Sequence, residues 1–165
     1  MSKTYKFGFL VHDLSANEIN YCLIRKINER IHKNIDEDFI VFYENLVQPC
    51  APCAFSTMQM VEAYSFDGMI ISTSLQQVQR ALSFPVPKTI LYMWELEWMR
   101  VQNKVFRQLF DLYNNKGLVL WSRSQSHANT VKQVWGANVE RINDYDFDRM
   151  RELYDSVVPE RKIFI

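Results

Sequence analysis

Five apolar runs in this chain each end in a small group of polar residues, and this pattern limits the folds that the chain can adopt. The polar groups are His12 with Asp13, Glu44 with Asn45, Ser72 with Thr73 and Ser74, Glu95 with Glu97, and Ser122 with Arg123 and Ser124. If the runs are parallel strands, these groups meet along one edge of a sheet, where open α/β folds bind their ligands. The pattern therefore predicts both an architecture and a site edge.

Segments with strand character alternate with segments of helical periodicity along the chain. Strands are expected over residues 6–11, 39–43, 69–71, 89–94, 118–121 and 139–142. Helices are expected over residues 15–32, 54–64, 75–82, 101–113, 126–136 and 147–157. Ser15, with Glu18 completing a capping box, is the expected N-cap of the first helix, and Ser126 is the expected cap of the fifth.

This alternation requires right-handed crossovers and a mainly parallel sheet that is covered by helices on both faces. We expect a single three-layer α/β/α domain over residues 1–165, with a mainly parallel sheet of five or six strands. The pattern does not determine the strand order. Rossmann-like and flavodoxin-like arrangements both remain open.

The composition bounds the class of protein. Nineteen basic residues balance nineteen acidic ones, so no net charge attracts the chain to nucleic acid, and we expect no nucleic-acid partner. No apolar stretch approaches the roughly 20 residues that span a bilayer, and the first residues do not resemble a signal peptide. We therefore expect a cytoplasmic protein without a membrane partner.

Cys50 and Cys53 form a Cys-Ala-Pro-Cys element between an expected strand and an expected helix. This element resembles the Cys-x-Pro-Cys element of thioredoxins, in which a helix N-terminus lowers a thiol pKa, and it implies a thiol oxidoreductase. The alternative interpretation is a loop that Pro52 stiffens beside two unreactive thiols. His12, His32 and His127 have no metal-ligand spacing, so no metal site is expected.

Two further groups carry binding chemistry. Glu95 and Glu97 stand between Trp94 and Trp98, so carboxylates for sugar hydroxyls and indole faces for an apolar ring would meet at the site edge. The alternative is that both tryptophans fill the core. Arg123, beside the start of an expected helix, could hold a phosphate or carboxylate.

Residues 117–129 (Gly-Leu-Val-Leu-Trp-Ser-Arg-Ser-Gln-Ser-His-Ala-Asn) contain a strand that ends in serine and is followed by a helix. Residues 134–147 then lead through a further strand to an Asn/Asp-rich crossover. This stretch resembles the end of the N-terminal half of GT-B-type glycosyltransferases. The resemblance implies an acceptor-binding half-domain, whereas the nucleotide sugar of such enzymes is held largely by a second half that does not follow here.

We therefore expect a glycosyltransferase-like domain that binds a sugar, a nucleotide or a similar hydroxylated anion; no cofactor and no catalytic residue is assigned. The expected ligand contacts are Asp13, Ser72, Thr73, Glu95, Arg123 and Ser124. The alternative is a non-enzymatic interaction or assembly protein, forming a homo-oligomer or binding a protein partner through Tyr92, Trp98 or Phe164. In this second case the general character of the chain resembles small proteins of large tailed phages.

Overall fold

Seven parallel strands form one sheet in the computed structural model, which describes residues 4–33, 36–86, 88–100 and 105–158. The strands are β1 (Tyr5–Val11), β2 (Glu37–Tyr43), β3 (Ser56–Gln59), β4 (Met69–Ser72), β5 (Thr89–Met93), β6 (Leu118–Ser122) and β7 (Glu140–Arg141). The helices are α1 (Glu18–Ile31), α2 (Leu75–Ala81), α3 (Phe106–Tyr113), α4 (Gln125–Trp135) and α5 (Phe147–Val157), with 3₁₀ turns η1 (Met60–Ser65) and η2 (Glu97–Arg100).

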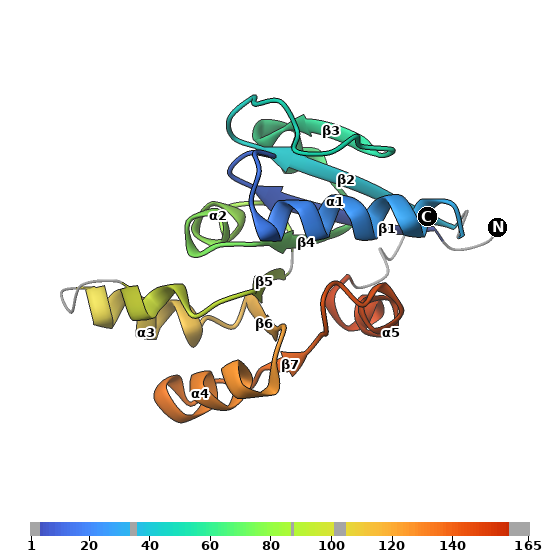
Figure 1. Cartoon of the computed structure of the whole chain (residues 1–165). Coiled ribbons are helices and arrows are strands. Elements are labelled where there is room, and N and C mark those ends of the chain that lie inside the picture. The colour runs from blue at the N-terminus through green and yellow to red at the C-terminus, as the bar shows by residue number, and fades with distance from the viewer. Residues whose placement is uncertain (1–3, 34–35, 87, 101–104, 159–165) are drawn as a thin grey trace, which may run out of the picture.

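The strands lie in the order β3-β2-β1-β4-β5-β6-β7 (Figure 1). The expected α/β class is confirmed, but the strand count of five or six is wrong, because β3 adds a seventh strand. Without β3 the remaining strands would follow the flavodoxin-like order, and with it they follow the Rossmann-like order. In both descriptions the direction of the strand order reverses between β1 and β4, which creates a crevice at that point.

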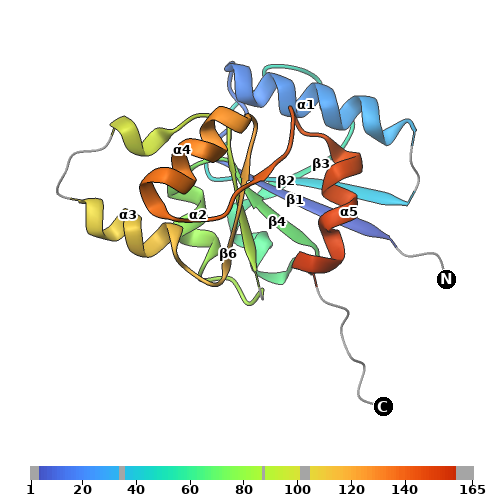
Figure 2. The ribbon, with the colours of Figure 1, turned by 90° about the horizontal axis from the view of Figure 1, so that it is seen from below.

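Helices cover both faces of the sheet. One face packs against α1 and α5, whose core residues include Leu23, Ile27 and Met150. The other face packs against η1, α2, α3 and α4. Figure 2 shows α1 and α5 on one side of the strands and α2, α3 and α4 on the other, so the molecule has the expected three layers.

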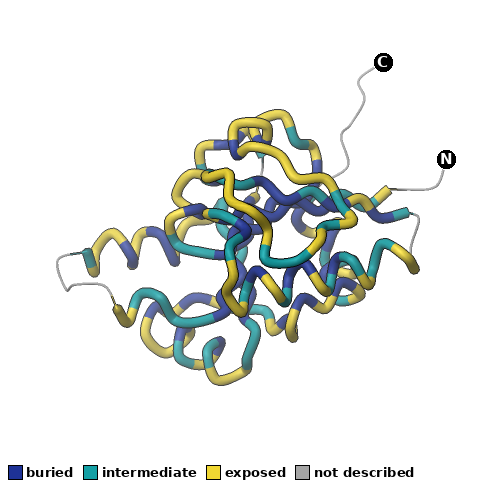
Figure 3. The backbone as a smooth tube through the Cα atoms, turned by 45° about the horizontal axis from the view of Figure 1, so that its top comes forward, coloured by how far each residue is buried: buried dark blue, intermediate teal, exposed yellow. Residues whose placement is uncertain are grey.

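Side chains of β1 alternate between the two faces, as the pleat of a strand requires. Phe7 and Phe9 belong to the cluster beneath α1 and α5, whereas Leu10 belongs to the cluster beneath η1 and α2. Phe147 of α5 packs against both phenylalanines of β1, at 6.1 Å between ring centroids in each case. Buried residues accordingly concentrate along β1, β2, β4 and β5, whereas β3 at the edge of the sheet is exposed (Figure 3).

The helix expected over residues 54–64 is wrong. Residues 56–59 instead pair in parallel with β2, from Ile40 opposite Ser56 to Tyr43 opposite Gln59, and η1 follows. Met58 and Val61, the apolar residues that suggested a buried helix face, are 40% and 62% exposed. Hydrogen bonds along the open edge of β2 therefore outweigh the local helical pattern.

Two expected helix caps are also wrong. Asn17 caps α1, because its side chain accepts a hydrogen bond from the N–H of Asn20, and Ser15 lies in the preceding loop. Ser124 caps α4 in place of Ser126 by accepting from the N–H of His127. The helix expected over 101–113 begins at Phe106 in the structure, and residues 101–104 of that expectation lie outside the described residues.

None of the helices in the described part of the chain combines the length and the apolar character that crossing a bilayer requires.

Candidate functional site

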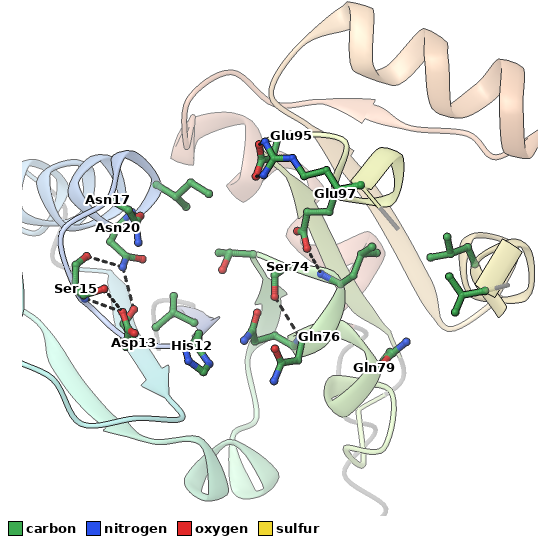
Figure 4. Close-up of a pocket in the computed structure, with 18 of the residues that line it drawn as sticks. His12, Asp13, Ser15, Asn17, Asn20, Ser74, Gln76, Gln79, Glu95 and Glu97 are labelled. Carbon is green, nitrogen blue, oxygen red and sulfur yellow. Dashed lines mark hydrogen bonds and ion pairs between the residues drawn. The ribbon is translucent and has the colours of Figure 1, made fainter. Parts of the chain in front are cut away.

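A cavity of about 730 Å³ lies at the carboxyl ends of β1, β4 and β5, where the strand order reverses. Its walls come from the β1–α1 loop, from the start of α2, and from the segment that leads from β5 through η2 to α3 (Figure 4). Small-molecule sites commonly have volumes of about 300–1,000 Å³. The crevice at a switch in strand order is also the usual ligand site of open α/β sheets, so this cavity is the candidate site.

The β1–α1 loop forms the first wall and is fixed by its own side chains. The buried side-chain amide of Asn20 donates to the carbonyl oxygens of Asp13 and Ser15, at 3.0 and 2.9 Å. Asp13 Oδ1 accepts from the hydroxyl and the backbone N–H of Ser15. These hydrogen bonds hold the pKa of Asp13 below its usual value, so this wall presents an ionised acceptor in a fixed loop.

The second wall is the end of β4 and the first turns of α2. The hydroxyl of Thr73 donates to a carbonyl of β1 at 3.0 Å, and Ser74 caps α2. Gln76, Gln77 and Gln79 line the cavity from α2. Gln77 is only 1% exposed, and its Nε2 has no hydrogen-bond partner among the residues that the structure describes.

The third wall carries two carboxylates in different surroundings. Glu95 forms a bidentate ion pair with Arg100, at 2.7 and 3.2 Å. Glu97 Oε2 accepts from the backbone N–H of Leu75 at 3.2 Å, which joins η2 to α2. Burial raises the pKa of Glu97 despite this hydrogen bond, whereas Glu95 lies half-exposed beside its guanidinium partner.

The lining is rich in amides and carboxylates and poor in free positive charge. Asp13, Glu95 and Glu97 contribute carboxyl groups, and the guanidinium of Arg100 is already paired. The side-chain amides of the lining belong to Asn17, Asn20, Gln76, Gln77, Gln79 and Gln108. Amides both donate and accept, and carboxylates accept, so the cavity suits hydroxyl and amide groups better than phosphates.

His12 stands at the rim of the cavity in a charged cluster. Its Nδ1 lies 2.7 Å from Glu44 Oε2, and Arg80 Nη1 lies 2.5 Å from Glu44 Oε1. The Glu44 side chain is buried between these two exposed partners. The cluster therefore connects the ends of β1 and β2 to α2 beside the cavity.

The structure brings together three of the six expected contact residues. Asp13, Thr73 and Glu95 line the cavity. Ser72 is fully buried at the end of β4 and is not part of the lining, although its Oγ has no partner among the described residues. Arg123 and Ser124 lie outside the lining.

Arg123 is engaged elsewhere at the ends of the strands. It forms ion pairs with Asp144 at 2.7 Å and with Glu18 at 3.3 Å, and its guanidinium lies 4.0 Å from the ring centroid of Trp94. Ser124 is used as the cap of α4. We therefore leave both residues out of the candidate site.

The two tryptophans take the alternative placement, because Trp94 is buried in the core and Trp98 is partly buried against it. Trp94 stacks on Tyr145 at 5.5 Å, and Trp98 packs edge-on against Trp135 at 5.3 Å; neither lines the cavity. Tyr92, expected as a residue for a subunit contact, is fully buried and donates to the carbonyl of Ile142. Phe164, the third residue that was expected to form such a contact, lies outside the described residues.

Cys50 and Cys53 lie in the loop before β3, with their thiols unpaired and partly buried. The expected helix after Cys53 is replaced by β3, so the two thiols do not stand at the start of a helix as the thioredoxin-like element requires. Burial raises the pKa of Cys53, which is the opposite of what activates a redox thiol. No group of three or more potential metal ligands occurs among the residues that the structure describes.

The expected contact set contained none of the side-chain amides that line the cavity. Asn20 and the three glutamines of α2 were missed because a pattern of apolar residues reports only which face is buried. The one available signal was their density, since residues 76, 77 and 79 are all glutamine in a short expected helix after a strand. Burial of Gln77, which distinguishes it from its neighbours, becomes visible only in the structure.

Fold and site together define an α/β protein with one parallel sheet and a polar cavity at the switch in strand order. Comparisons with protein-family models, with curated proteins and with solved structures find no match to this chain.

Proposed function

We propose that the protein binds a neutral polyhydroxylated small molecule, such as a sugar or the ribose of a nucleoside, in the cavity at the ends of β1, β4 and β5. The observation that carries this proposal is the chemistry of the lining, in which amides and carboxylates surround a volume of about 730 Å³. Hydroxyl groups donate to carboxylates and exchange hydrogen bonds with amides. The proposal keeps the sugar of the glycosyltransferase-like expectation and gives up the anion.

Charge is the reason for preferring a neutral ligand. A bound phosphate would face the carboxyl groups of Asp13 and Glu97, whereas Glu95 and Arg100 neutralise each other in their ion pair. Like charges close together in a partly buried site disfavour binding. We therefore expect a phosphate group to weaken binding of an otherwise suitable sugar.

The test is a titration followed by calorimetry and by two-dimensional NMR. Glucose, N-acetylglucosamine and uridine are compared with glucose 6-phosphate and uridine monophosphate. At least one neutral compound should bind and shift resonances of the cavity, and its phosphate should bind about tenfold more weakly. Tighter binding of the phosphates, or binding by none of the compounds, would contradict the proposal.

A matched pair of variants locates the site. Asp13→Asn removes an ionised acceptor from the cavity and should weaken binding of the neutral compound about tenfold. Asp38→Asn makes the same change at an exposed residue of β2 outside this lining and should leave binding unchanged. Equal effects of the two substitutions would exclude the cavity as the binding site.

A second candidate function, self-assembly, has one observation in its favour. Met99, Phe106, Phe110 and Val134 are large apolar residues with exposed fractions between 41% and 67%, and they come from η2, α3 and α4. Phe106 contacts Trp135, the neighbour of Val134, which joins α3 to α4. Sedimentation of the wild-type chain and of Phe110→Ser tests this function, since a dimer formed by this surface should dissociate in the variant.

A further inference from the structure

One end of the cavity is polar and is built by the loop between β1 and α1. The side chains of this loop that line the cavity and are at least partly exposed are His12, Asp13, Ser15 and Asn17. Two apolar residues line the same end, but Val11 is only 1% exposed and Ile19 stands on α1 beside the polar loop. This end therefore offers hydrogen-bonding groups that suit the hydroxyls of a ligand.

Another part of the cavity has an apolar wall. Val105 and Leu109, at the start of α3, and Leu75, at the start of α2, line it. Leu75 and Val105 are partly exposed, and both pack against the cluster of buried residues that contains Leu109. The three side chains thus belong to one apolar surface. Gln108, the remaining residue of α3 in the lining, is an uncharged amide.

Glu97 borders this apolar wall, because its Oε2 accepts from the backbone N–H of Leu75. Burial raises the pKa of its carboxyl group, as expected beside apolar side chains. The carboxyl group of Asp13, in the polar loop, has a lowered pKa instead. The two parts of the lining therefore differ in polarity as well as in composition.

The order of the strands separates the two parts. Strand β4 lies between β1 and β5, and α3 follows β5 through η2. The loop after β1 and the segment after β5 therefore start two strand spacings apart, about 9–10 Å. In Figure 4, Asp13, Ser15 and Asn17 lie on the left of the cavity, and Glu97 lies on the right. A molecule that contacts both parts must be longer than one sugar ring.

We infer that the ligand is a glycoside and not a free sugar: its hydroxylated ring binds at the β1–α1 loop, and a second, flat and less polar ring packs on Leu75, Val105 and Leu109. Covering this wall with a ring removes apolar surface from water, which favours binding. Nucleosides and aryl glycosides share this chemistry. The inference rests on the proposed function, because it places the hydroxylated molecule of that proposal at one end of the cavity and adds a second group to it.

Two pairs of compounds that differ only in the second ring test the inference by calorimetric titration. Methyl β-D-ribofuranoside is compared with uridine, and methyl β-D-glucoside is compared with 4-nitrophenyl β-D-glucoside. In at least one pair the compound with the second ring should bind about tenfold more tightly. The pair that shows this gain distinguishes a nucleoside from an aryl glycoside. Equal affinities within both pairs would overturn the inference and leave the proposed function standing.

Nuclear Overhauser effects locate the two rings of the tighter compound on protein with labelled valine, leucine and isoleucine methyl groups. Protons of the second ring should show effects to the methyl groups of Val105 and Leu109. Protons of the sugar should show them to the backbone N–H of Ser15. Effects from the second ring to Val11 and Ile19 instead would mean that the ring binds at the other end, and would overturn the inference.

A matched set of variants tests the apolar wall. Leu109→Ala should weaken binding of the compound with two rings about tenfold and leave the methyl glycoside unaffected. Because Leu109 is 8% exposed and also belongs to the core, Val105→Thr provides a second test that preserves the shape of the side chain. It should weaken the same compound about threefold. Val61→Thr, the same change at an exposed residue of η1 outside this lining, should have no effect.

Each outcome with these variants decides the inference. If Leu109→Ala and Val105→Thr bind the compound with two rings as tightly as the wild type does, or if Val61→Thr weakens it as much as Val105→Thr, the second ring does not pack on this wall and the inference is wrong. If Leu109→Ala does not fold, Val105→Thr and the Overhauser effects decide. If none of the four compounds binds to the wild type and those of the first titration also fail, the proposed function fails and the inference fails with it.

Discussion

Asp13 and Glu97 line one cavity, yet their surroundings shift their proton affinities in opposite directions. Hydrogen bonds from Ser15 lower the pKa of Asp13, whereas burial raises the pKa of Glu97. A pair of carboxyl groups with separated pKa values offers an acceptor that stays ionised and a group that gains a proton more easily. The difference arises from the elements that carry them, since Asp13 lies in a polar loop and Glu97 is pressed against α2.

The raised pKa of Glu97 implies that the stability of the fold depends on pH. A group whose pKa is higher in the folded state than in the unfolded state stabilises the fold at low pH, and this contribution is lost as pH rises above about 4.3 and through the folded pKa. Glu97→Gln cannot ionise, yet its side-chain oxygen can still accept from Leu75. The variant should therefore gain stability relative to the wild type between pH 4 and pH 8.

Thermal unfolding of the wild type and of Glu97→Gln across this pH range measures the effect. Glu62→Gln, at an exposed residue of η1, provides the matched control and should show no such trend. A stability difference between Glu97→Gln and the wild type that is constant with pH would show that Glu97 ionises freely in the fold.

Gly68 shows how one small residue is required by close packing. A Cβ atom at this position would lie 2.5 Å from the carbonyl oxygen of Lys6, a backbone atom that cannot move without displacing β1. Gly68→Ala should therefore destabilise the protein by about 2 kcal/mol or more, measured by urea unfolding. Gly117→Ala, whose nearest contact is a side-chain oxygen at 3.2 Å, should cost less; an equal cost at both positions would contradict this account.

At the scale of elements, the structure of α4 shows which of two serines is its N-cap, a choice that the sequence pattern alone does not make. Ser124 accepts from the N–H of His127 as the N-cap, and Ser126 lies exposed in the first turn. Ser124→Ala should cost about 1 kcal/mol, whereas Ser126→Ala should be neutral or slightly stabilising because alanine favours the helix interior. Urea unfolding of both variants is the measurement. A larger loss of stability in Ser126→Ala than in Ser124→Ala would indicate that Ser126 is the N-cap, as expected from the sequence.

The same comparison shows how far local patterns reach. The helix Phe147–Val157 is predicted to the residue, because Asp146 caps it and its apolar stripe faces a core. The strand at residues 56–59 is missed, because it forms by hydrogen bonding to residues 40–43 of β2, and a local sequence pattern does not include these residues. The position of the site edge follows from the strands, but its amide lining depends on how α2 packs, and no local pattern reports that.

At the scale of the whole molecule, the first strand and the last helix of the described chain share one core. Met150 of α5 is fully buried in the cluster that contains Phe7, Phe9 and Leu23. Met150→Ala should therefore destabilise the whole protein by about 2–5 kcal/mol. Unfolding followed by tryptophan fluorescence and by far-UV circular dichroism should shift to lower urea by the same amount, as expected for one cooperative unit.

Glu152→Ala, at an exposed residue of the same helix, loses only a surface ion pair with Arg149 and should cost less than about 1 kcal/mol. Transitions of Met150→Ala that separate between the two probes would show that α5 and the sheet unfold independently, and would contradict the expectation of a single domain.

The packing of α5 on β1 has a consequence for protein synthesis. When β1 leaves the ribosome, the cover of its phenylalanine side chains stays incomplete until α5 has also been translated, because Phe147 and Met150 complete that part of the core. Exposed aromatic side chains on a nascent chain are binding sites for chaperones and are prone to aggregation. The native fold is therefore completed only after the ribosome has translated α5, however early the neighbouring strands emerge.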